Sequence, residues 1–541
     1  MYNEMCMTIL IIGANIMTVK DKILSGKTFL GIEFGSTRVK AVLIDDTSAP
    51  IAGGAFDWEN SLDNGIWSYP LSQIHQALQG CYRSLCEDIK EKYGVIPTEF
   101  AALGISGMMH GYMPFDKNGE LLVPFRTWRN TFTADAAAKL SAELGFNVPA
   151  RWSISHLYHA VLSGEAHIPQ LERMTTLAGY IHYMLTGRFE VGIGEASGIF
   201  PVSEGTYNAE YIPKAEAMLA AAGFDKKLSD ILPAVRQAGD KGAFLTEEGA
   251  RFLDPTGTLK AGIPVCPPEG DAGTGMTATN SVRAGTGNIS AGTSIFSMLV
   301  LEKPLKGMYP EIDVVTTPDG YDVAMVHCNN CCSEIDFWVR LFGEFAELSG
   351  NKADKSELYG MLYRNALSAP ADCEGVTACN FISGEPVAGA ASGKPMYMRE
   401  QDSRPSLGGF FRAQLYATFA ALKLGNDILF KQEKVTAARF NGHGGLFKVS
   451  GVASQLMADA LGVPVAVMTT AGEGGAWGMA LLAQFMVCGE GKTLPDWLDE
   501  SVFASSEAAV SQPDSEGGRG FESYMERYAQ LLSFEKTVKE G

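Results

Sequence analysis

Short apolar runs separated by glycine-rich turns organise this sequence. Residues 29–32 predict a buried strand, Gly35-Ser36-Thr37 predicts a turn, and residues 39–44 predict a second strand, so that together they form a β-hairpin with a polar tip. The same pattern returns at residues 288–301, where Gly292-Thr293-Ser294 separates two apolar runs. Because the two turns lie far apart and no short-period repeat connects them, the sequence predicts two similarly built domains rather than a solenoid.

Helix-like and strand-like patterns alternate along the rest of the chain. Helices are expected at residues 71–93, 177–185, 414–430, 454–461, 472–485 and 524–534, and strands at residues 101–105, 436–440 and 463–467. The region 504–520 is rich in Ser, Glu, Gly and Asp and is expected to be a loop. Strands that alternate with helices predict an α/β fold.

The length of the chain implies more than one domain. At 541 residues it exceeds the size of a single hydrophobic core, so two or three domains are expected. Residues 1–27 precede the first convincing strand and are interpreted as a poorly ordered leader. We expect an N-terminal domain at residues 28–281, a C-terminal domain at residues 282–490, and a C-terminal tail with a helix at residues 491–541.

Composition restricts the partners and the compartment. Hydrophobic residues make up 46% and charged residues 19%, as in ordinary globular proteins, and no run reaches the roughly 18 apolar residues of a membrane span. The net charge of −19 argues against nucleic acid, whose phosphates are neutralised by clustered Lys and Arg, but it does not exclude a nucleotide. The ten cysteines include one tight group, Cys328, Cys331 and Cys332, without the second pair of a zinc site. They are interpreted as reduced thiols of a cytoplasmic protein.

Each of the two glycine-hydroxyl turns is a candidate phosphate site. Such a turn offers successive backbone N–H groups and hydroxyls without side-chain bulk, as a phosphate chain requires. A single turn of this kind is more often an ordinary hairpin turn. Two matching turns at the heads of two domains favour a nucleotide held between the domains.

Three other residues carry candidate chemistry, and each has a plainer interpretation. Asp271 stands at an expected helix start and is either an N-cap or a general base. His110 follows the strand at residues 101–105, where ligands gather in α/β folds, although a His beside Met109 is more often a packing residue. Trp128, next to Arg129, either stacks on a sugar or fills a loop. The residues alone leave these alternatives open.

In their order along the chain, these segments resemble the FGGY family of carbohydrate kinases, in the actin–hexokinase–Hsp70 superfamily. The resemblance runs from about residue 29 to residue 485. Its segments are residues 31–41, 104–111, Trp128, 178–187, 196–198, 270–271, 292–294, 384–386, Gly442 with Gly444 and Gly445, and 472–478. It implies two ribonuclease-H-like (actin-like ATPase) domains with ATP and a sugar in the cleft between them, the N-terminal domain binding the sugar and the C-terminal domain the nucleotide.

The resemblance also implies a role for each candidate residue. Asp271 falls where these kinases carry their catalytic base, and Glu33 falls where an Asp usually helps to hold Mg²⁺. The implied ATP-binding residues are Gly35, Ser36, Thr37, Lys40, Gly292, Thr293, Ser294, Gly444 and Gly445. The implied sugar-binding residues are Met109, His110, Trp128 and Asp271 itself.

Two departures from the family pattern stand in this sequence. Glu33 keeps the negative charge of the usual Asp but extends its reach by one methylene. Arg129-Asn130-Thr131 replaces the Asp and the later Arg that commonly follow the tryptophan in xylulose kinases, which puts the identity of the sugar in question more than the reaction.

The sequence therefore predicts a cytoplasmic enzyme, dependent on ATP and Mg²⁺, that phosphorylates the terminal hydroxyl of a ketopentose such as L-ribulose or D-xylulose. Its expected partners are small molecules, with no nucleic acid and no membrane, and a homodimer is the expected assembly. The alternatives are a kinase of another sugar or polyol, a superfamily ATPase, and a sugar-binding protein without phosphotransfer.

Overall fold

The computed structural model describes residues 17–468 and 474–535. Its first large sheet has the strand order β14-β15-β6-β1-β2-β3, with β16 paired to β6. These strands are β1 (Phe29–Phe34), β2 (Arg38–Ile44), β3 (Pro50–Asp57), β6 (Ala102–Gly107), β14 (Ala243–Phe244), β15 (Pro264–Val265) and β16 (Glu269–Gly270).

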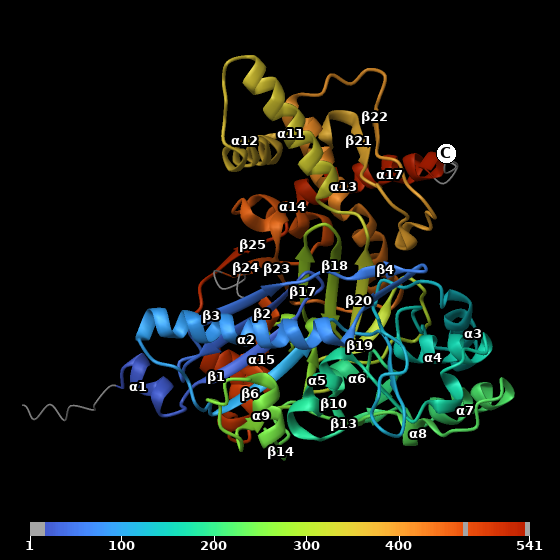
Figure 1. Cartoon of the computed structure of the whole chain (residues 1–541). Coiled ribbons are helices and arrows are strands. Elements are labelled where there is room, and N and C mark those ends of the chain that lie inside the picture. Colours follow the sequence, from blue (N-terminus) through green and yellow to red (C-terminus); the bar gives the residue numbers. More distant parts are fainter. Residues whose placement is uncertain (1–16, 469–473, 536–541) are drawn as a thin grey trace, which may run out of the picture.

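The second large sheet has the order β19-β20-β18-β17-β23-β24-β25. Its strands are β17 (Thr286–Ala291), β18 (Ile295–Val300), β19 (Asp313–Thr316), β20 (Asp322–Cys328), β23 (Arg439–His443), β24 (Val465–Met468) and β25 (Ala508–Ser511). Figure 1 shows this sheet and its helices above the first sheet.

Both sheets are built around the same arrangement. In the first, the antiparallel hairpin β1–β2 is extended by antiparallel β3 on one side and parallel β6 on the other. In the second, the hairpin β17–β18 is extended by antiparallel β20 and parallel β23 in the same way. Both predicted hairpins and the prediction of two similarly built α/β domains are confirmed.

Helices cover these sheets largely as the apolar periodicity predicts. The helix α2 (Leu71–Tyr93) packs along β3, and α5 (Leu177–Thr186) packs against β6. In the second domain α13 (Leu407–Asp427) lies in the core together with α14 (Val452–Leu461). The strand expected at residues 436–440 begins later, at Arg439, where its pairing with Thr286 of β17 starts.

One helix crosses from the second half of the sequence to the first domain. The helix α15 (Gly474–Cys488) lies within the range 282–490 expected for the C-terminal domain, yet it packs on β1, β6 and α10 (Asp271–Ala278) (Figure 1). Its glycines allow this close packing, since a Cβ added to Gly478 would stand 2.0 Å from the Thr274 carbonyl oxygen. Residues 474–485 of the predicted helix are described, and residues 472 and 473 lie outside the described part.

Within the expected tail at residues 491–541, residues 508–535 belong to the second domain, whereas Leu494, Trp497 and Leu498 pack in the same core cluster as α15. The loop expected at residues 504–520 is wrong, because β25 pairs with β24 and α17 (Ser515–Glu535) already begins within it. An edge strand is held by backbone hydrogen bonds, so the small and polar residues of β25 give little apolar signal. Phe521, Tyr524 and Tyr528 of α17 are buried in the core of the second domain.

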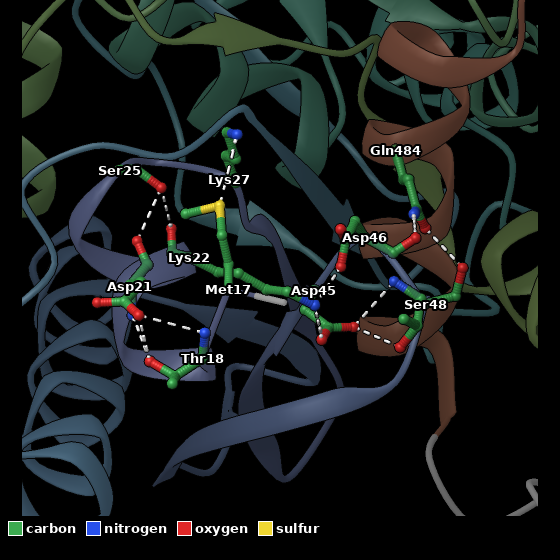
Figure 2. A network of polar contacts seen from close by, with 11 residues as sticks. Met17, Thr18, Asp21, Lys22, Ser25, Lys27, Asp45, Asp46, Ser48 and Gln484 are labelled. Atoms are coloured by element: carbon green, nitrogen blue, oxygen red, sulfur yellow. Dashed lines mark hydrogen bonds and ion pairs between the residues drawn. The ribbon is translucent and has the colours of Figure 1, made fainter. Parts of the chain in front are cut away.

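The leader expected at residues 1–27 is partly ordered. Thr18 caps the short helix α1 (Val19–Leu24) in a capping box with Asp21, and Lys22 forms ion pairs with Asp45 and Asp46 after β2. Figure 2 shows this network, which continues from Ser48 to Gln484 of α15 at 2.8 Å. The expectation is therefore wrong for residues 17–27, and residues 1–16 lie outside the described residues.

Candidate active site

The first glycine-hydroxyl turn is held from one side by its carbonyl groups. Trp58 donates its indole N–H to the Gly35 carbonyl at 2.7 Å, and the Tyr69 hydroxyl donates to the Ser36 carbonyl at 2.5 Å. In a planar trans peptide the N–H points opposite to the C=O, so the amides of Ser36 and Thr37 face the other side. Among residues 17–468 and 474–535, no acceptor takes up these two amides. They are free to bind an anion.

The second turn repeats this arrangement with different partners. The backbone amide of Cys332 donates to the Gly292 carbonyl at 3.1 Å, and that of Cys331 donates to the Thr293 carbonyl at 3.0 Å. The amides of Thr293 and Ser294 consequently face away from these contacts. In both turns the carbonyls of the first two residues are thus hydrogen-bonded and the following amides face the other way, although the Gly35 amide donates to the Arg38 carbonyl and the Gly292 amide to the Ser294 carbonyl.

The strand β23 brings Gly444 next to the second turn. Ser290 of β17 pairs with His443, and Gly444 follows with a φ of 101°. A Cβ on Gly444 would lie 2.3 Å from the carbonyl oxygen of Ala291, so no other residue fits there. The structure therefore joins the predicted ATP residues Gly292–Ser294 to Gly444 and Gly445 on adjacent strand ends.

Asp271 is the first residue of α10, and its carboxylate is open to solvent. Gly270, not Asp271, is the N-cap, so the N-cap interpretation is wrong. The Asp271 Oδ1 accepts hydrogen bonds from the amides of Met109 and Ala272, both at 3.1 Å. Desolvation by the surrounding protein raises the pKa of the Asp271 carboxyl, and the hydrogen bonds from these two amides partly oppose that rise. Asp271 is thus a fixed, accessible carboxylate with increased basicity.

Glu33 is near enough to Asp271 for the two carboxylate charges to repel each other. It stands on β1 opposite Lys40 of β2, and its Oε1 atom would be 2.2 Å from a Cβ on Gly475 at the start of α15. Burial raises the pKa of Glu33 to about 7, the Asp271 charge adds to the rise, and Lys40 opposes it. A cation placed between Glu33 and Asp271 would relieve this repulsion, so the carboxylates fit a hard metal ion such as Mg²⁺. Among the described residues, however, no group of three or more His, Cys, Asp or Glu side chains forms a metal site by itself.

Two further carboxyl groups, of Glu195 and Glu269, lie buried behind Asp271, and neither is predicted from the sequence. Glu269 Oε2 accepts the amide of Glu195 at 3.1 Å, and both side chains are essentially inaccessible. Burial raises the pKa of Glu269 to about 8 and that of Glu195 well above its usual range. Within the described part of the chain, neither Glu195 oxygen has a hydrogen-bond partner. The available signal was a glutamate inside each of two otherwise apolar, glycine-rich segments.

The two residues of the predicted sugar segment differ in their surroundings. Met109 contacts Asp271 through its backbone amide, as described above. His110 is buried, has a φ of 71°, lies 3.3 Å through Nδ1 from the Gly198 carbonyl oxygen, and stacks near Trp152. Burial holds the pKa of His110 well below its usual range, so the ring is neutral. Its role in sugar binding stays a prediction.

Trp128 and Asn130 belong to a loop next to the first turn. The Trp128 indole is 37% exposed and donates to the Ser36 hydroxyl at 3.2 Å. Asn130 is buried: its Oδ1 accepts the Trp67 amide at 2.8 Å, and its Nδ2 donates to the carbonyls of Trp67 and Thr127 at 2.8 and 2.9 Å. Asn130 therefore fixes the loop, and the departure from Asp at this point has a structural cause.

Comparison with protein families decides the identity of this arrangement. The model of the N-terminal domain of the FGGY family of carbohydrate kinases matches residues 28–277, and that of the C-terminal domain matches residues 287–487. The chain belongs to the FGGY family of carbohydrate kinases. It is a phosphotransferase that uses a nucleotide, as this kinase family does. No helix in the described ranges has the length and apolar character needed to cross a membrane.

Individual relatives of this FGGY kinase are distant in sequence. It is 24% identical to the xylulose kinase of Haemophilus influenzae over 522 residues, which cover 93% of this chain and 99% of the relative. Its fold is similar to that of ligand-bound xylulose kinase from Lactobacillus acidophilus, with a TM-score of 0.76, 18% identity and coverage of 94% and 98%. It is also similar to Plasmodium falciparum glycerol kinase with ADP, with a TM-score of 0.74, 14% identity and coverage of 95% and 99%. These structural similarities show the fold.

Proposed function

We propose that this FGGY kinase transfers the γ-phosphoryl group of ATP to the terminal hydroxyl of a ketopentose, D-xylulose or L-ribulose. One observation carries the proposal: Asp271 is an accessible carboxylate of raised pKa, anchored by the Met109 amide of the predicted sugar segment. The relatives named xylulose kinases, from Haemophilus influenzae and Lactobacillus acidophilus, support a ketopentose as the acceptor.

The proposed reaction needs one proton acceptor and two phosphate-binding turns. Asp271 accepts the proton of the terminal hydroxyl while that oxygen forms a bond to the γ-phosphorus, and the bond from phosphorus to the β-phosphate oxygen of the leaving ADP breaks. The free amides at residues 36–37 and 293–294 bind the phosphates, and Gly444 and Gly445, beside the second turn, contact the adenosine. Mg²⁺, when bound near Glu33, would offset the negative charge of the phosphates.

Positioning accounts for most of the expected rate enhancement. The base contributes about 10²- to 10⁴-fold, and the remainder comes from alignment of the sugar and from electrostatic stabilisation by the turns. Met109, His110 and Trp128 form the proposed sugar site, and Lys40 is proposed to assist phosphate binding. We further propose that the enzyme acts as a homodimer in the cytoplasm, in line with its reduced cysteines.

Two measurements test the function. Phosphorylation rates with D-xylulose, L-ribulose, ketohexoses, polyols and glycerol should show the highest kcat/KM with a ketopentose. Asp271→Asn should lower kcat by about 10²- to 10⁴-fold and leave affinity for a non-hydrolysable ATP analogue within about threefold. Retention of phosphorylation within a few-fold of the parent rules out Asp271 as the base, and ADP release indifferent to every sugar indicates an ATPase.

A further inference from the structure

Trp128, a residue of the proposed sugar site, is hydrogen-bonded to the first phosphate-binding turn. In the described part of the chain, three aromatic side chains form hydrogen bonds with this turn, and two of them, Trp58 and Tyr69, are buried and stack with ring centroids 4.1 Å apart. The third, Trp128, donates its indole N–H to Ser36 Oγ at 3.2 Å while more than a third of its surface remains exposed. Trp128 alone among the three both contacts the turn and presents a ring surface to a ligand.

The loop that carries Trp128 is fixed on both sides of this residue. Before it, the amide of Thr127 donates to the Trp67 carbonyl at 3.1 Å, and after it Asn130 makes its three hydrogen bonds. The Arg129 guanidinium lies over the Trp67 ring, 3.7 Å from its centroid. The loop is thereby held on β5 (Ile66–Tyr69), the strand that also supplies Tyr69 to the turn. Trp128 and Ser36 are consequently held by one common strand.

The hydrogen bond from Trp128 determines what the Ser36 hydroxyl can do. An indole N–H is a donor only, so Ser36 Oγ must accept, and a hydroxyl that accepts still keeps its own proton to donate. The sulfur of Met108, at 4.0 Å, is a weak partner for that proton. A phosphate oxygen beside the free amides of Ser36 and Thr37 would be a far stronger acceptor.

We propose that Trp128 is a positioning residue that couples the two substrate sites, by holding the Ser36 hydroxyl toward the ATP phosphates when its ring contacts the sugar. The inference rests on the proposed function for the assignment of the two sites. It adds that the sugar and the nucleotide bind cooperatively through one side-chain bond. A sugar packed on the ring immobilises the indole, which lowers the ordering cost of the Ser36 bond when phosphate arrives.

Because of thermodynamic linkage, the coupling can be measured by titrating either ligand in the presence of the other. If D-xylulose tightens binding of AMP-PNP, a non-hydrolysable ATP analogue, by some factor, then AMP-PNP must tighten D-xylulose by the same factor. A single hydrogen bond corresponds to a factor of about 2 to 10. We expect this factor in the wild type and a factor close to 1 in Trp128→Phe, which keeps an aromatic ring but has no N–H.

The experiment is isothermal titration of AMP-PNP with Mg²⁺, with and without saturating D-xylulose, on wild type, Trp128→Phe, Ser36→Ala, Ser36→Thr and the double variant Trp128→Phe/Ser36→Ala. Trp128→Phe and Ser36→Ala should each remove the coupling, and the double variant should be no worse than Ser36→Ala alone. Ser36→Thr keeps a hydroxyl and should keep the coupling. Trp338→Phe, on α11 (Ser333–Leu348) of the second domain, is the matched control and should behave as wild type.

Specific outcomes overturn the inference. These are a Trp128→Phe protein whose coupling equals that of wild type, or additive effects of Trp128→Phe and Ser36→Ala. A wild type that binds AMP-PNP with no effect of any sugar overturns it as well. Failure of the proposed function is distinguishable: a protein that couples AMP-PNP to a sugar but phosphorylates no ketopentose refutes the reaction and supports the coupling. Thermal unfolding of each variant distinguishes these results from loss of structure. If Trp128→Phe does not fold, Ser36→Ala, which removes only one oxygen, still tests the hydrogen bond between Trp128 and Ser36.

Discussion

Replacement of Asn130 by Asp tests whether this position selects the sugar or holds the fold. The change restores the residue that xylulose kinases commonly carry after the tryptophan, and it replaces an NH₂ group by an oxygen. The Nδ2 atom of Asn130 donates to two carbonyls, at 2.8 and 2.9 Å, in a side chain that is 2% exposed. An ionised Asp would place an oxygen against both carbonyl oxygens, so we expect the protein to lose stability.

The size of the loss follows from two limits. The lower limit is one lost hydrogen bond, about 1 kcal/mol, because each carbonyl keeps a second donor: the Thr127 amide for Trp67 and the Asn130 amide for Thr127. The upper limit is the cost of protonating an Asp of ordinary pKa at neutral pH, about 4 kcal/mol. We expect a loss between these limits, about 1 to 4 kcal/mol, or a decrease in Tm of roughly 2 to 16 °C for a domain of this size.

The pH dependence identifies the cause. The folded state would raise the pKa of the new carboxyl, so between the unfolded and folded pKa values the folded state binds more protons than the unfolded state. Stability then falls as pH rises through this range. Thermal unfolding at pH 5 and pH 8 should therefore show a larger deficit at pH 8. Asn351→Asp, at an exposed position, adds the same charge and should leave Tm within about 1 °C.

One result would refute the structural explanation. If Asn130→Asp leaves Tm unchanged at both pH values but alters the ratio of kcat/KM for D-xylulose and L-ribulose, then Asn130 acts on the sugar and not on the loop.

Three other changes test the carboxyl groups around Asp271. The folded state raises the pKa of Glu33 from 4.5 to about 7. As pH rises through that range, the stability of wild type should therefore fall by up to about 3 kcal/mol relative to Glu33→Gln. Equal pH dependence of the two Tm values would contradict this. Gly475→Ala places a Cβ 2.2 Å from Glu33 Oε1 and should lower kcat by at least about tenfold by displacing the carboxyl; normal steady-state kinetics would show that the site adapts. Because burial raises the pKa of Glu195, wild type should lose stability relative to Glu195→Gln as pH rises; equal pH dependence of their Tm values would contradict this.

The sequence predicts those parts of the fold that local patterns determine. Both hairpins are recognisable because a glycine-hydroxyl turn between two apolar runs has few other conformations. The helix at residues 71–93 is recognisable by its periodicity. The destination of α15 was not predictable, because packing on β1 depends on contacts between residues more than 400 positions apart, such as the hydrogen bond between Ser48 and Gln484.

The same distinction, between features set by local sequence and features set by long-range contacts, applies to the candidate site. Asp271, Glu33 and the glycines follow from their order along the chain. The supports of the site do not: Trp58 and Tyr69 carry no motif, and only the folded chain brings them under residues 35–36. Likewise, the burial of Glu195 and Glu269 behind Asp271 arises from the meeting of α6 (Ile193–Ala196) and β16, which are far apart in sequence.

The position of α15 has a consequence for how the protein is made. The face of the first sheet that this helix covers remains open until residues 474–488 leave the ribosome, tens of seconds after β1 at about 5 to 20 residues per second. Until then, the first half of the chain exposes the apolar face of its sheet that α15 later covers. Expression of residues 17–281 alone should yield a protein that aggregates, and supplying the helix as a separate peptide should rescue its solubility.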